Sequence, residues 1–221
     1  MTASAPTDDP LARASVLTAA LASDALDALG MRDQAVACDL PPLALNTHLV
    51  GYAVPVSVLA VEQIPLEPYT CEMRAIEHLG PGDVPVYSVR DGVRAALFGE
   101  LFSLAARERG AVGAIVDGRV RDVRQLVEVG FPVFARGRST LDTLGRAEVA
   151  SIGDPVVVGG VEVHLRDLVV ADDDGIVIVP RSMISAVLDH VNEKIRGERG
   201  ARDDIISGDS VREVWDRWRV F

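Results

Sequence analysis

The sequence predicts an α/β fold with mixed sheets and a helical C-terminal arm. In the first part of the chain, short apolar runs rich in valine alternate with segments of helical period, an order typical of parallel strands joined by helices. Two later β-rich runs are interrupted by Gly-Gly and by Asp-Asp-Asp-Gly, which favour antiparallel hairpins. Helical period then returns. We therefore expect one domain over residues 16–182, followed by a C-terminal arm over residues 183–221.

The first regular element is expected to be a helix that follows a flexible N-terminal tail, residues 1–15. Apolar residues beginning at Leu17 fall at helical spacing, and the pattern stops at Gly30, a residue that commonly ends helices. Four later runs are apolar, short and bounded by turn residues or charge, which indicates buried strands. These runs are residues 49–61, 84–89, 111–116 and 131–136.

Helical period also marks two segments between the predicted strands. Residues 95–109 end in charge before Gly110, and a short helix is expected over residues 126–129. Gly99 lies inside the first segment, where glycine costs about 1 kcal/mol relative to alanine and so needs a reason. The alternative is a helix that begins near Gly99, whose free N–H groups would bind a carboxylate.

The antiparallel hairpins are expected over residues 155–165 and 168–180. The C-terminal arm that follows carries Trp215 and Trp218 among many charged residues. A segment this polar does not bury two indole rings by itself, so the rings are expected to mark a contact surface. Self-assembly accounts for such a surface most simply, and we expect the arm at an interface between subunits.

Composition and charge exclude several classes of function. The 221 residues carry a net charge of −11, which repels phosphate backbones, so nucleic acid is not an expected partner. We find neither a secretory signal pattern nor an apolar run long enough to span a membrane. We therefore expect a cytoplasmic protein without a membrane partner. Cys38 and Cys71, the two cysteines, are expected to be free thiols.

The strongest candidate for chemistry is the stretch DGRVRDVRQL, residues 117–126. It holds three arginines and two aspartates directly after a predicted strand that ends at Val116. Open α/β folds keep their ligand crevices at the carboxyl ends of parallel strands. Arg121 offers a planar fork for carboxylates, and Asp122 offers hard oxygen ligands for Mg²⁺ or Mn²⁺. The alternative is a solvated loop in which Asp122 is a helix N-cap.

Other candidates are weaker. The run Asp172-Asp173-Asp174-Gly175 lies between two valine-rich strands, where a hairpin turn is the favoured interpretation. The four histidines lack the clustering of a transition-metal site. Ser139 and Cys71 have no visible base partner for nucleophilic catalysis. The chain has no G-x-G-x-x-G motif, so the sequence gives no support to a nucleotide-dependent methyltransferase.

Four blocks carry a resemblance to a known family. They read SDALDALG, AIEHLGPGDVPVY, FGELFSLAARERGAVGAIVDGRVRDVRQLVEVGFPVFARG and DLVVADDDGIVIVP. In this order and spacing they are similar to the RraA-like and HMG/CHA aldolase family. This family contains 4-hydroxy-4-methyl-2-oxoglutarate aldolases and regulators of RNase E activity. The resemblance runs from about residue 16 to the C-terminus.

The resemblance implies a swivelling β/β/α fold, assembled as a homotrimer or as a hexamer of two trimers, with active sites between subunits. In the aldolase branch, Mg²⁺ or Mn²⁺ promotes retro-aldol cleavage of a 4-hydroxy-2-oxo acid to pyruvate. The substrate is of the 4-hydroxy-4-methyl-2-oxoglutarate or 4-carboxy-4-hydroxy-2-oxoadipate type. The same sites often decarboxylate oxaloacetate. A small oxo acid is therefore the expected ligand.

The family's site residues carry over by position. Arg121 would hold the pyruvate-derived oxygens, and Asp122 would bind the metal directly or through water. The backbone groups of Gly99, Glu100 and Leu101 would receive the substrate carboxylate. The resemblance also implies a metal-binding carboxylate from the C-terminal arm of a neighbouring subunit. Glu198 fits that role best, with Glu193 as the second choice, and the alternative for both is a solvated helical face.

One position departs from the family pattern. The family follows Arg-Asp with an acidic side chain, whereas this chain continues Val123-Arg124-Gln125. Gln125 stands at the catalytic position, but an amide does not accept a proton at neutral pH. Gln125 thus favours the alternative of a non-catalytic regulator of the RNase E inhibitor type. The retained Arg121-Asp122 pair and Gly99 favour a metal-dependent lyase, which is our prediction.

Overall fold

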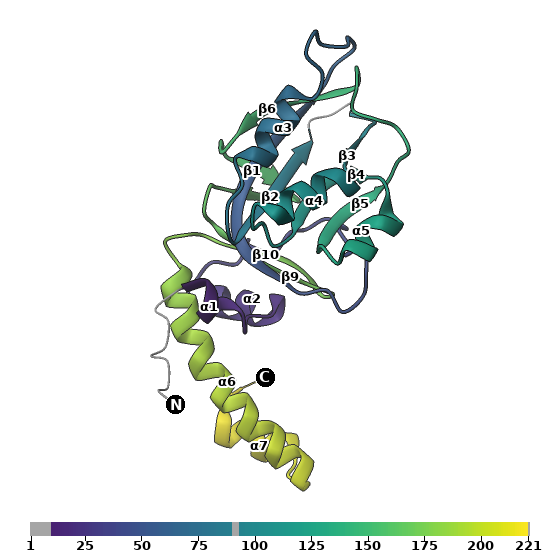
Figure 1. Ribbon diagram of the computed structural model, residues 1–221. Helices are drawn as coiled ribbons and strands as arrows, with labels where there is room; N and C mark the ends of the chain where they lie inside the picture. Colours follow the sequence, from purple (N-terminus) through teal and green to yellow (C-terminus); the bar gives the residue numbers. More distant parts are fainter. Residues whose placement is uncertain (1–9, 90–92, 221) are drawn as a thin grey trace, which may run out of the picture.

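The fold is a mixed α/β domain with a protruding C-terminal arm (Figure 1). A computed structural model describes residues 10–89 and 93–220. The main sheet has eight strands in the order β10-β9-β1-β2-β4-β3, and β5 and β6 pair with β4 and β1. Strands β7 and β8 form a separate hairpin sheet. The fold class expected from the sequence is therefore confirmed.

The strands of the first half pair in parallel, as their alternation with helices predicts. They are β1 (Leu49–Ala60), β2 (Asp83–Val89), β3 (Ala96–Phe98), β4 (Ala114–Val120) and β5 (Val133–Arg138). The later strands pair antiparallel, as the turn sequences at 159–160 and 172–175 predict for the last four of them. They are β6 (Ala147–Ile152), β7 (Val156–Val158), β8 (Val161–Val163), β9 (Leu168–Asp172) and β10 (Gly175–Val179).

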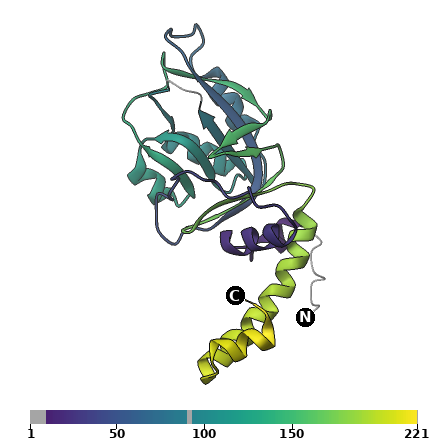
Figure 2. The same ribbon diagram turned by 180° about the vertical axis from the view of Figure 1, so that it is seen from behind.

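Helices cover one face of the main sheet, and the hairpin sheet packs on the other. Helices α3 (Thr70–Glu77), α4 (Glu100–Glu108) and α5 (Val123–Val129) lie on the face that Figure 1 shows, and Figure 2 shows the reverse side. Side chains alternate across a strand. Val116 of β4 therefore packs with the helices, whereas Ile115 packs with the valines of β7 and β8.

A third apolar cluster joins the arm to the sheet. It contains side chains from α1 (Pro10–Ala14), α2 (Ala19–Ala28), β9, β10 and the first half of α6 (Ile184–Ser207). The rest of α6 extends away from the domain, and α7 (Val211–Trp218) folds back against it. In that hairpin Trp218 donates a hydrogen bond to Asp204 (2.6 Å) and leaves no room for a side chain at Gly200.

Several expected boundaries are wrong. Residues 10–14 of the expected flexible tail form α1, with Ala14 buried, while residues 1–9 lie outside the described part of the chain. The segment 95–109 contains β3 before its helix, because Ala96–Phe98 pair with β4 in the core. The strand expected to end at Val116 continues to Val120. Strand β6 has no counterpart among the expected elements.

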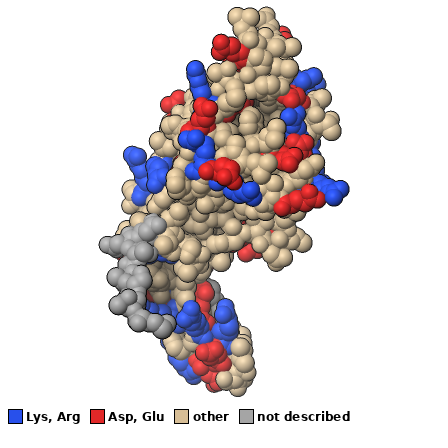
Figure 3. Space-filling model, viewed as in Figure 1, with Lys and Arg blue, Asp and Glu red and all other residues tan. Residues whose placement is uncertain are grey.

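Surface charge and hydropathy agree with the composition. Figure 3 shows acidic and basic side chains interspersed over the face viewed, without a continuous basic surface. Of the helices that the structure describes, none combines the length and the apolar character needed to cross a membrane. Trp215 and Trp218 each expose more than a third of their surface on the arm, and their role at a subunit interface remains a prediction.

Candidate functional site

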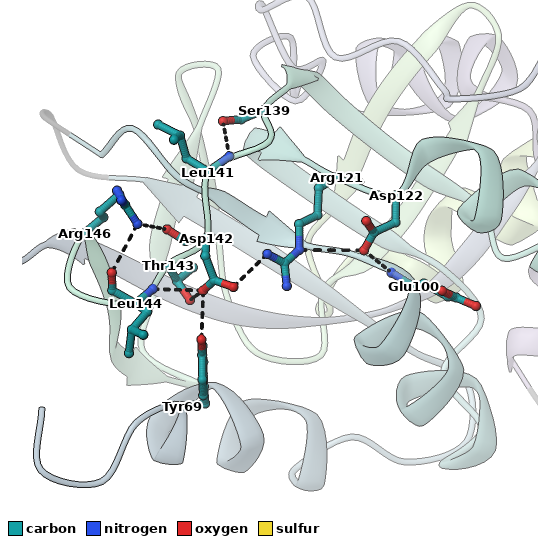
Figure 4. Close-up of polar contacts among 10 residues, drawn as sticks. All are labelled: Tyr69, Glu100, Arg121, Asp122, Ser139, Leu141, Asp142, Thr143, Leu144 and Arg146. Atoms are coloured by element: carbon teal, nitrogen blue, oxygen red, sulfur yellow. Dashed lines mark hydrogen bonds and ion pairs between the residues drawn. The ribbon is translucent and has the colours of Figure 1, made fainter. Parts of the chain in front are cut away.

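Arg121 and Asp122 lie directly after the carboxyl end of β4. The Arg121 N–H donates a hydrogen bond to the Phe98 carbonyl (3.0 Å), which ties this turn to the end of β3. Asp122 then adopts a left-handed conformation (φ 56°) and begins α5. Such a conformation is uncommon for residues other than glycine, although aspartate tolerates it better than most. Figure 4 shows that the Asp122 side chain points toward Glu100 at the start of α4, whereas the Arg121 guanidinium points toward Asp142.

The Asp122 side chain caps a different helix from the one that it begins. It makes no capping hydrogen bond to α5, and its Oδ2 accepts a hydrogen bond of 3.4 Å from the N–H of Glu100, the first residue of α4. The N-cap alternative is therefore correct for the backbone position but wrong for the side chain. Asp122 links the end of β4 to the N-terminus of α4.

Gly99 is required by close packing at this link. Its φ of −154° is extended backbone that any residue adopts. A Cβ atom at Gly99, however, would lie 2.7 Å from Asp122 Oδ2 and 3.1 Å from Arg121 Cγ. The helix begins at Glu100, as the alternative interpretation of the sequence expected. Glycine at this position thus makes space for the Arg121-Asp122 pair.

Arg121 bridges two carboxylates. Its Nη1 donates a hydrogen bond of 2.7 Å to Asp142 Oδ2, and its Nε lies 3.7 Å from Asp122 Oδ2 (Figure 4). The other oxygen of Asp142 accepts hydrogen bonds from the Tyr69 hydroxyl (3.1 Å) and the Leu144 N–H (3.0 Å). The guanidinium is therefore held through Nη1 and Nε, and its Nη2 has no hydrogen-bond or ion-pair partner among the residues that the structure describes, so its N–H groups are left for a ligand.

The network fixes the charges of its members. Burial raises the pKa of Asp142, but hydrogen bonds from the Leu144 N–H, Arg121 and Tyr69 outweigh it, and the net shift of that pKa is downward. The hydrogen bond to Asp142 raises the pKa of Arg121. Burial, followed by the hydrogen bond to Asp142, raises the pKa of Tyr69. At neutral pH Asp142 and Arg121 are thus charged, and Tyr69 is protonated.

Asp142→Asn is expected to destabilise the protein most near neutral pH. A carboxyl group with a lowered folded-state pKa contributes stability above its unfolded pKa of about 3.9, and loses it as the pH falls through the folded value. The difference in unfolding free energy from wild type should therefore shrink below about pH 4. Urea unfolding across the acid range measures it. Asp154→Asn is the control, because Asp154 is exposed and has no polar side-chain partner in the described chain. A difference independent of pH would contradict this account.

These groups line a cleft of about 370 Å³ between α3, β3 and α4. The N–H groups of Leu101 and Phe102, in the first turn of α4, have no acceptor in the described part of the chain. The first N–H groups of a helix commonly bind anions, and the helix dipole favours negative charge there. The cleft therefore presents a guanidinium edge, a carboxylate and free backbone donors.

The other predicted site residues lie elsewhere. Gln125 is exposed on α5 and does not line the cleft, and Glu100 contributes its N–H rather than its side chain. Glu193 and Glu198 lie on α6 in the arm, away from the cleft of the same chain. Glu198 lies 3.8 Å from Lys194, and Glu193 lines a hollow beside α2. Their part in a neighbouring subunit's site remains a prediction.

Sequence reasoning missed Asp142 and Tyr69. Asp142 lies in the loop after β5, and Tyr69 precedes α3 in a left-handed conformation (φ 62°). A bulky residue rarely adopts that conformation, and strained backbone of this kind clusters at functional sites. Neither residue belongs to a motif, and both reach Arg121 only through tertiary contacts. The sequence carries no signal that would have identified them.

The fit of a divalent metal depends on Asp122. The described residues contain no group of three or more His, Cys, Asp or Glu side chains placed to hold a metal ion. Asp142 is already engaged by Arg121, whereas the Asp122 side chain is 40% exposed toward the cleft. Mg²⁺ keeps several waters and is commonly bound through one or two carboxylates together with its substrate. Asp122 fits that pattern as a single protein ligand.

The acidic run Asp172-Asp173-Asp174-Gly175 and the two cysteines lie outside the candidate site. Asp172 accepts hydrogen bonds from the N–H groups of Ala19 (2.8 Å) and Asp174 (3.0 Å), and Asp173 accepts one from Asn46 (2.8 Å). The run therefore builds a hairpin turn, as predicted. Cys38 and Cys71 are free thiols.

This geometry and the fold define a family. Residues 18–178 match the RraA-like family (Aldolase/RraA), and the chain belongs to it. A protein of Halalkalibacterium halodurans named "Putative 4-hydroxy-4-methyl-2-oxoglutarate aldolase" is 30% identical over 192 residues, which cover 87% of this chain and 85% of the relative. A 4-hydroxy-4-methyl-2-oxoglutarate aldolase of Thermus thermophilus is 32% identical over 111 residues, covering 48% and 65%.

Solved structures share the fold along most of the chain. Streptomyces coelicolor RraAS2, described as an unusual member of the RNase ES inhibitor RraA protein family, has a TM-score of 0.78 at 26% identity. That match covers 91% of this chain and 99% of RraAS2. An uncharacterized protein of Pseudomonas syringae has a TM-score of 0.80 at 26% identity, covering 93% and 96%. The family expected from the four sequence blocks is confirmed.

Proposed function

We propose that this protein is a divalent-metal-dependent lyase that cleaves a 4-hydroxy-2-oxo acid to pyruvate by a retro-aldol reaction. One observation carries the proposal. Arg121 and Asp122 lie side by side against the free N–H groups of α4, in an open cleft. Relatives named as 4-hydroxy-4-methyl-2-oxoglutarate aldolases support the same reaction.

The residues of the cleft have complementary tasks. The Leu101 N–H, with Gly99 and Glu100 shaping the turn before it, would receive the C1 carboxylate of the substrate. The free edge of Arg121 would donate hydrogen bonds to the C2 oxygen, where negative charge develops as the C3–C4 bond breaks. Asp142 accepts a hydrogen bond from Arg121, and Tyr69 donates one to Asp142. These two contacts keep the guanidinium in place. Such preorganised donors favour the enolate over the substrate.

Asp122 would hold Mg²⁺ or Mn²⁺ directly or through water, with Glu198 of a neighbouring subunit as a further ligand. When bound, the ion would act as a Lewis acid toward the C2 oxygen. The C4 hydroxyl must also lose a proton. Gln125 is a neutral amide outside the cleft, and Asp142 is committed to Arg121. We assign the proton transfer to a water molecule hydrogen-bonded to Asp122. The same site would decarboxylate oxaloacetate, which also yields a pyruvate enolate.

The test is release of pyruvate by the full-length protein. 4-Hydroxy-4-methyl-2-oxoglutarate and oxaloacetate are each supplied with Mg²⁺, with Mn²⁺ and with EDTA. A mock purification from cells that lack the protein is the control. Metal-dependent release supports the lyase. Release from neither substrate would favour the alternative of a regulator, for which the likeness to RraAS2 is the supporting observation.

Gly99→Ala is expected to lower kcat/KM for pyruvate release by about 10–10²-fold, because a displacement of about 1 Å at a catalytic group costs this much. The added methyl group would overlap Asp122 Oδ2 and must displace it. Gly137→Ala is the matched control, since a Cβ atom there meets nothing within 4 Å. Steady-state kinetics with far-ultraviolet circular dichroism measures both variants. Equal activity of the two would contradict the packing argument.

A further inference from the structure

A buried carboxyl group lies behind the candidate site. Glu72, in the first turn of α3, exposes only 8% of its surface. Its side chain accepts a hydrogen bond from its own N–H, and no other residue in the described part of the chain bonds to it. Buried glutamates are rare unless they are paired, because an unpaired charge is costly to bury. The position of Glu72 therefore needs an explanation.

The surroundings of Glu72 supply further acidic groups and no cation. Its side chain lines a small cavity together with Glu67 and with Glu148 of β6. The cavity measures about 10 Å³, near the minimum that holds one water molecule. Glu148 accepts a hydrogen bond from the Cys71 thiol (3.6 Å). No Lys, Arg or His among the described residues forms an ion pair with Glu72. A charge on Glu72 would thus have little solvent and no partner.

These surroundings favour the protonated form of Glu72. Burial raises the pKa of its carboxyl group, and the hydrogen bond from its own N–H offsets only part of this effect. The negative charges of Glu148 and Asp142 raise this pKa further. The other titratable groups near Glu72 remain neutral at neutral pH, because burial raises the pKa of each; they are Tyr69, Cys71 and Tyr87.

The start of α3 connects Glu72 to the candidate site. Tyr69 directly precedes the helix, and its hydroxyl donates the 3.1 Å hydrogen bond to Asp142 (Figure 4). Asp142 in turn accepts the hydrogen bond from Arg121. Tyr69 lines both the small cavity and the cleft. A negative charge on Glu72 would repel Glu148 and Asp142. Relief of that repulsion would move the first turn of α3, and Tyr69 with it.

We propose that Glu72 is a proton-operated switch of the candidate site. Protonated Glu72 lets the first turn of α3 pack against β6 and keeps Tyr69 hydrogen-bonded to Asp142. When the pH rises, the proton passes to solvent, the carboxylate becomes charged, and the contact between Tyr69 and Asp142 opens. Asp142 then holds Arg121 without the support of Tyr69. The switch concerns the geometry of this network and does not depend on which reaction the cleft performs.

The first arm of the test measures the switch without turnover. Carbon-13 resonances of the carboxyl groups, compared between wild type and Glu72→Gln in EDTA, locate the titration of Glu72. The Leu144 N–H, which also binds Asp142, reports on the network. We expect Glu72 to titrate above the ordinary value of about 4.3. The Leu144 resonance should shift with the same midpoint in wild type and not in Glu72→Gln. A shift with that midpoint in both proteins, or a Glu72 midpoint at or below about 4.3, would overturn the proposal.

The second arm measures stability by urea unfolding. A group with a raised folded-state pKa contributes stability below its unfolded pKa, about 4.3 for glutamate, and loses it as the pH rises through the folded value. Between these two values the unfolding constant of wild type should rise about tenfold per pH unit relative to that of Glu72→Gln. Glu77→Gln is the control, because Glu77 is an exposed residue of the same helix. A difference between wild type and Glu72→Gln that is independent of pH would contradict the switch.

The third arm uses the proposed reaction. For 4-hydroxy-4-methyl-2-oxoglutarate, kcat/KM of wild type should fall about tenfold over the pH range in which Glu72 titrates, since small displacements at a site cost this much. The fall should be absent in Glu72→Gln, which stays uncharged, and in Tyr69→Phe, which lacks the hydroxyl. An equal fall in Glu72→Gln would overturn the proposal. If no pyruvate is released by any of these proteins, the lyase is wrong, and the first two arms decide the switch.

Discussion

Asp122→Asn is expected to reduce metal-dependent pyruvate release by about 10²–10³-fold, because loss of the bound ion removes several kcal/mol of charge stabilisation. Asparagine preserves the size of the side chain and one oxygen acceptor, so the hydrogen bond from the Glu100 N–H can persist. The charge that attracts a cation is lost. The expected result is therefore a folded protein that no longer responds to Mg²⁺ or Mn²⁺.

Two measurements separate this result from a structural defect. Mn²⁺ binding, followed by electron paramagnetic resonance, is expected to weaken in Asp122→Asn and not in Asp154→Asn, whose exposed carboxylate lies outside the cleft. Urea unfolding shows whether the fold is retained. Full metal-dependent activity in Asp122→Asn would remove Asp122 from the proposed metal site.

Arg121→Lys is expected to lower kcat/KM by about 10²–10³-fold, the effect of removing one preorganised donor from a developing oxyanion. Lysine keeps the positive charge but lacks the planar fork of arginine. It cannot bind Asp142 at one edge and the substrate at the other, as Arg121 is placed to do. The loss is expected in kcat more than in KM, because the developing oxyanion exists only in the transition state.

The matched control for this change is Arg124→Lys. Arg124 lies three residues further along, with an 85% exposed side chain that pairs with Glu128 on the surface of α5. Exposed pairs of this kind contribute only a few tenths of a kcal/mol, so its kinetics should equal those of wild type. If Arg121→Lys retained wild-type kcat, a point charge would suffice and the fork geometry would have no role.

Much of the fold could be predicted because its signals are local. Short apolar runs rich in valine identified β1 and β2, helical apolar spacing identified α2, and Gly-Gly at 159–160 and Asp-Asp-Asp-Gly identified the hairpins. The predictions failed where pairing with a distant strand decides the secondary structure. Ala96–Phe98 reads as the start of a helix, but β4 pairs with it as a strand. Strand β6 is likewise defined by pairing with β1 rather than by its own pattern.

The candidate site also combines residues that a local pattern predicts with residues that only tertiary contacts bring together. The order strand, Arg-Asp, helix places Arg121 and Asp122 at the carboxyl edge of a parallel sheet, and a glycine inside a helical pattern drew attention to Gly99. Local spacing does not reveal which groups complete the site. Tyr69 and Asp142 lie 73 residues apart, and only in the folded chain does Tyr69 hydrogen-bond to Asp142 and Asp142 to Arg121.

The sequence by itself determined the α/β class, the parallel and antiparallel halves, and the location of the Arg121-Asp122 pair, because apolar periodicity, turn chemistry and strand order are written along the chain. Only the tertiary structure decided that Asp122 caps α4, that Asp142 holds one edge of Arg121, and that apolar side chains form the far wall of the cleft. These features depend on distances between segments far apart in sequence, which no local pattern specifies.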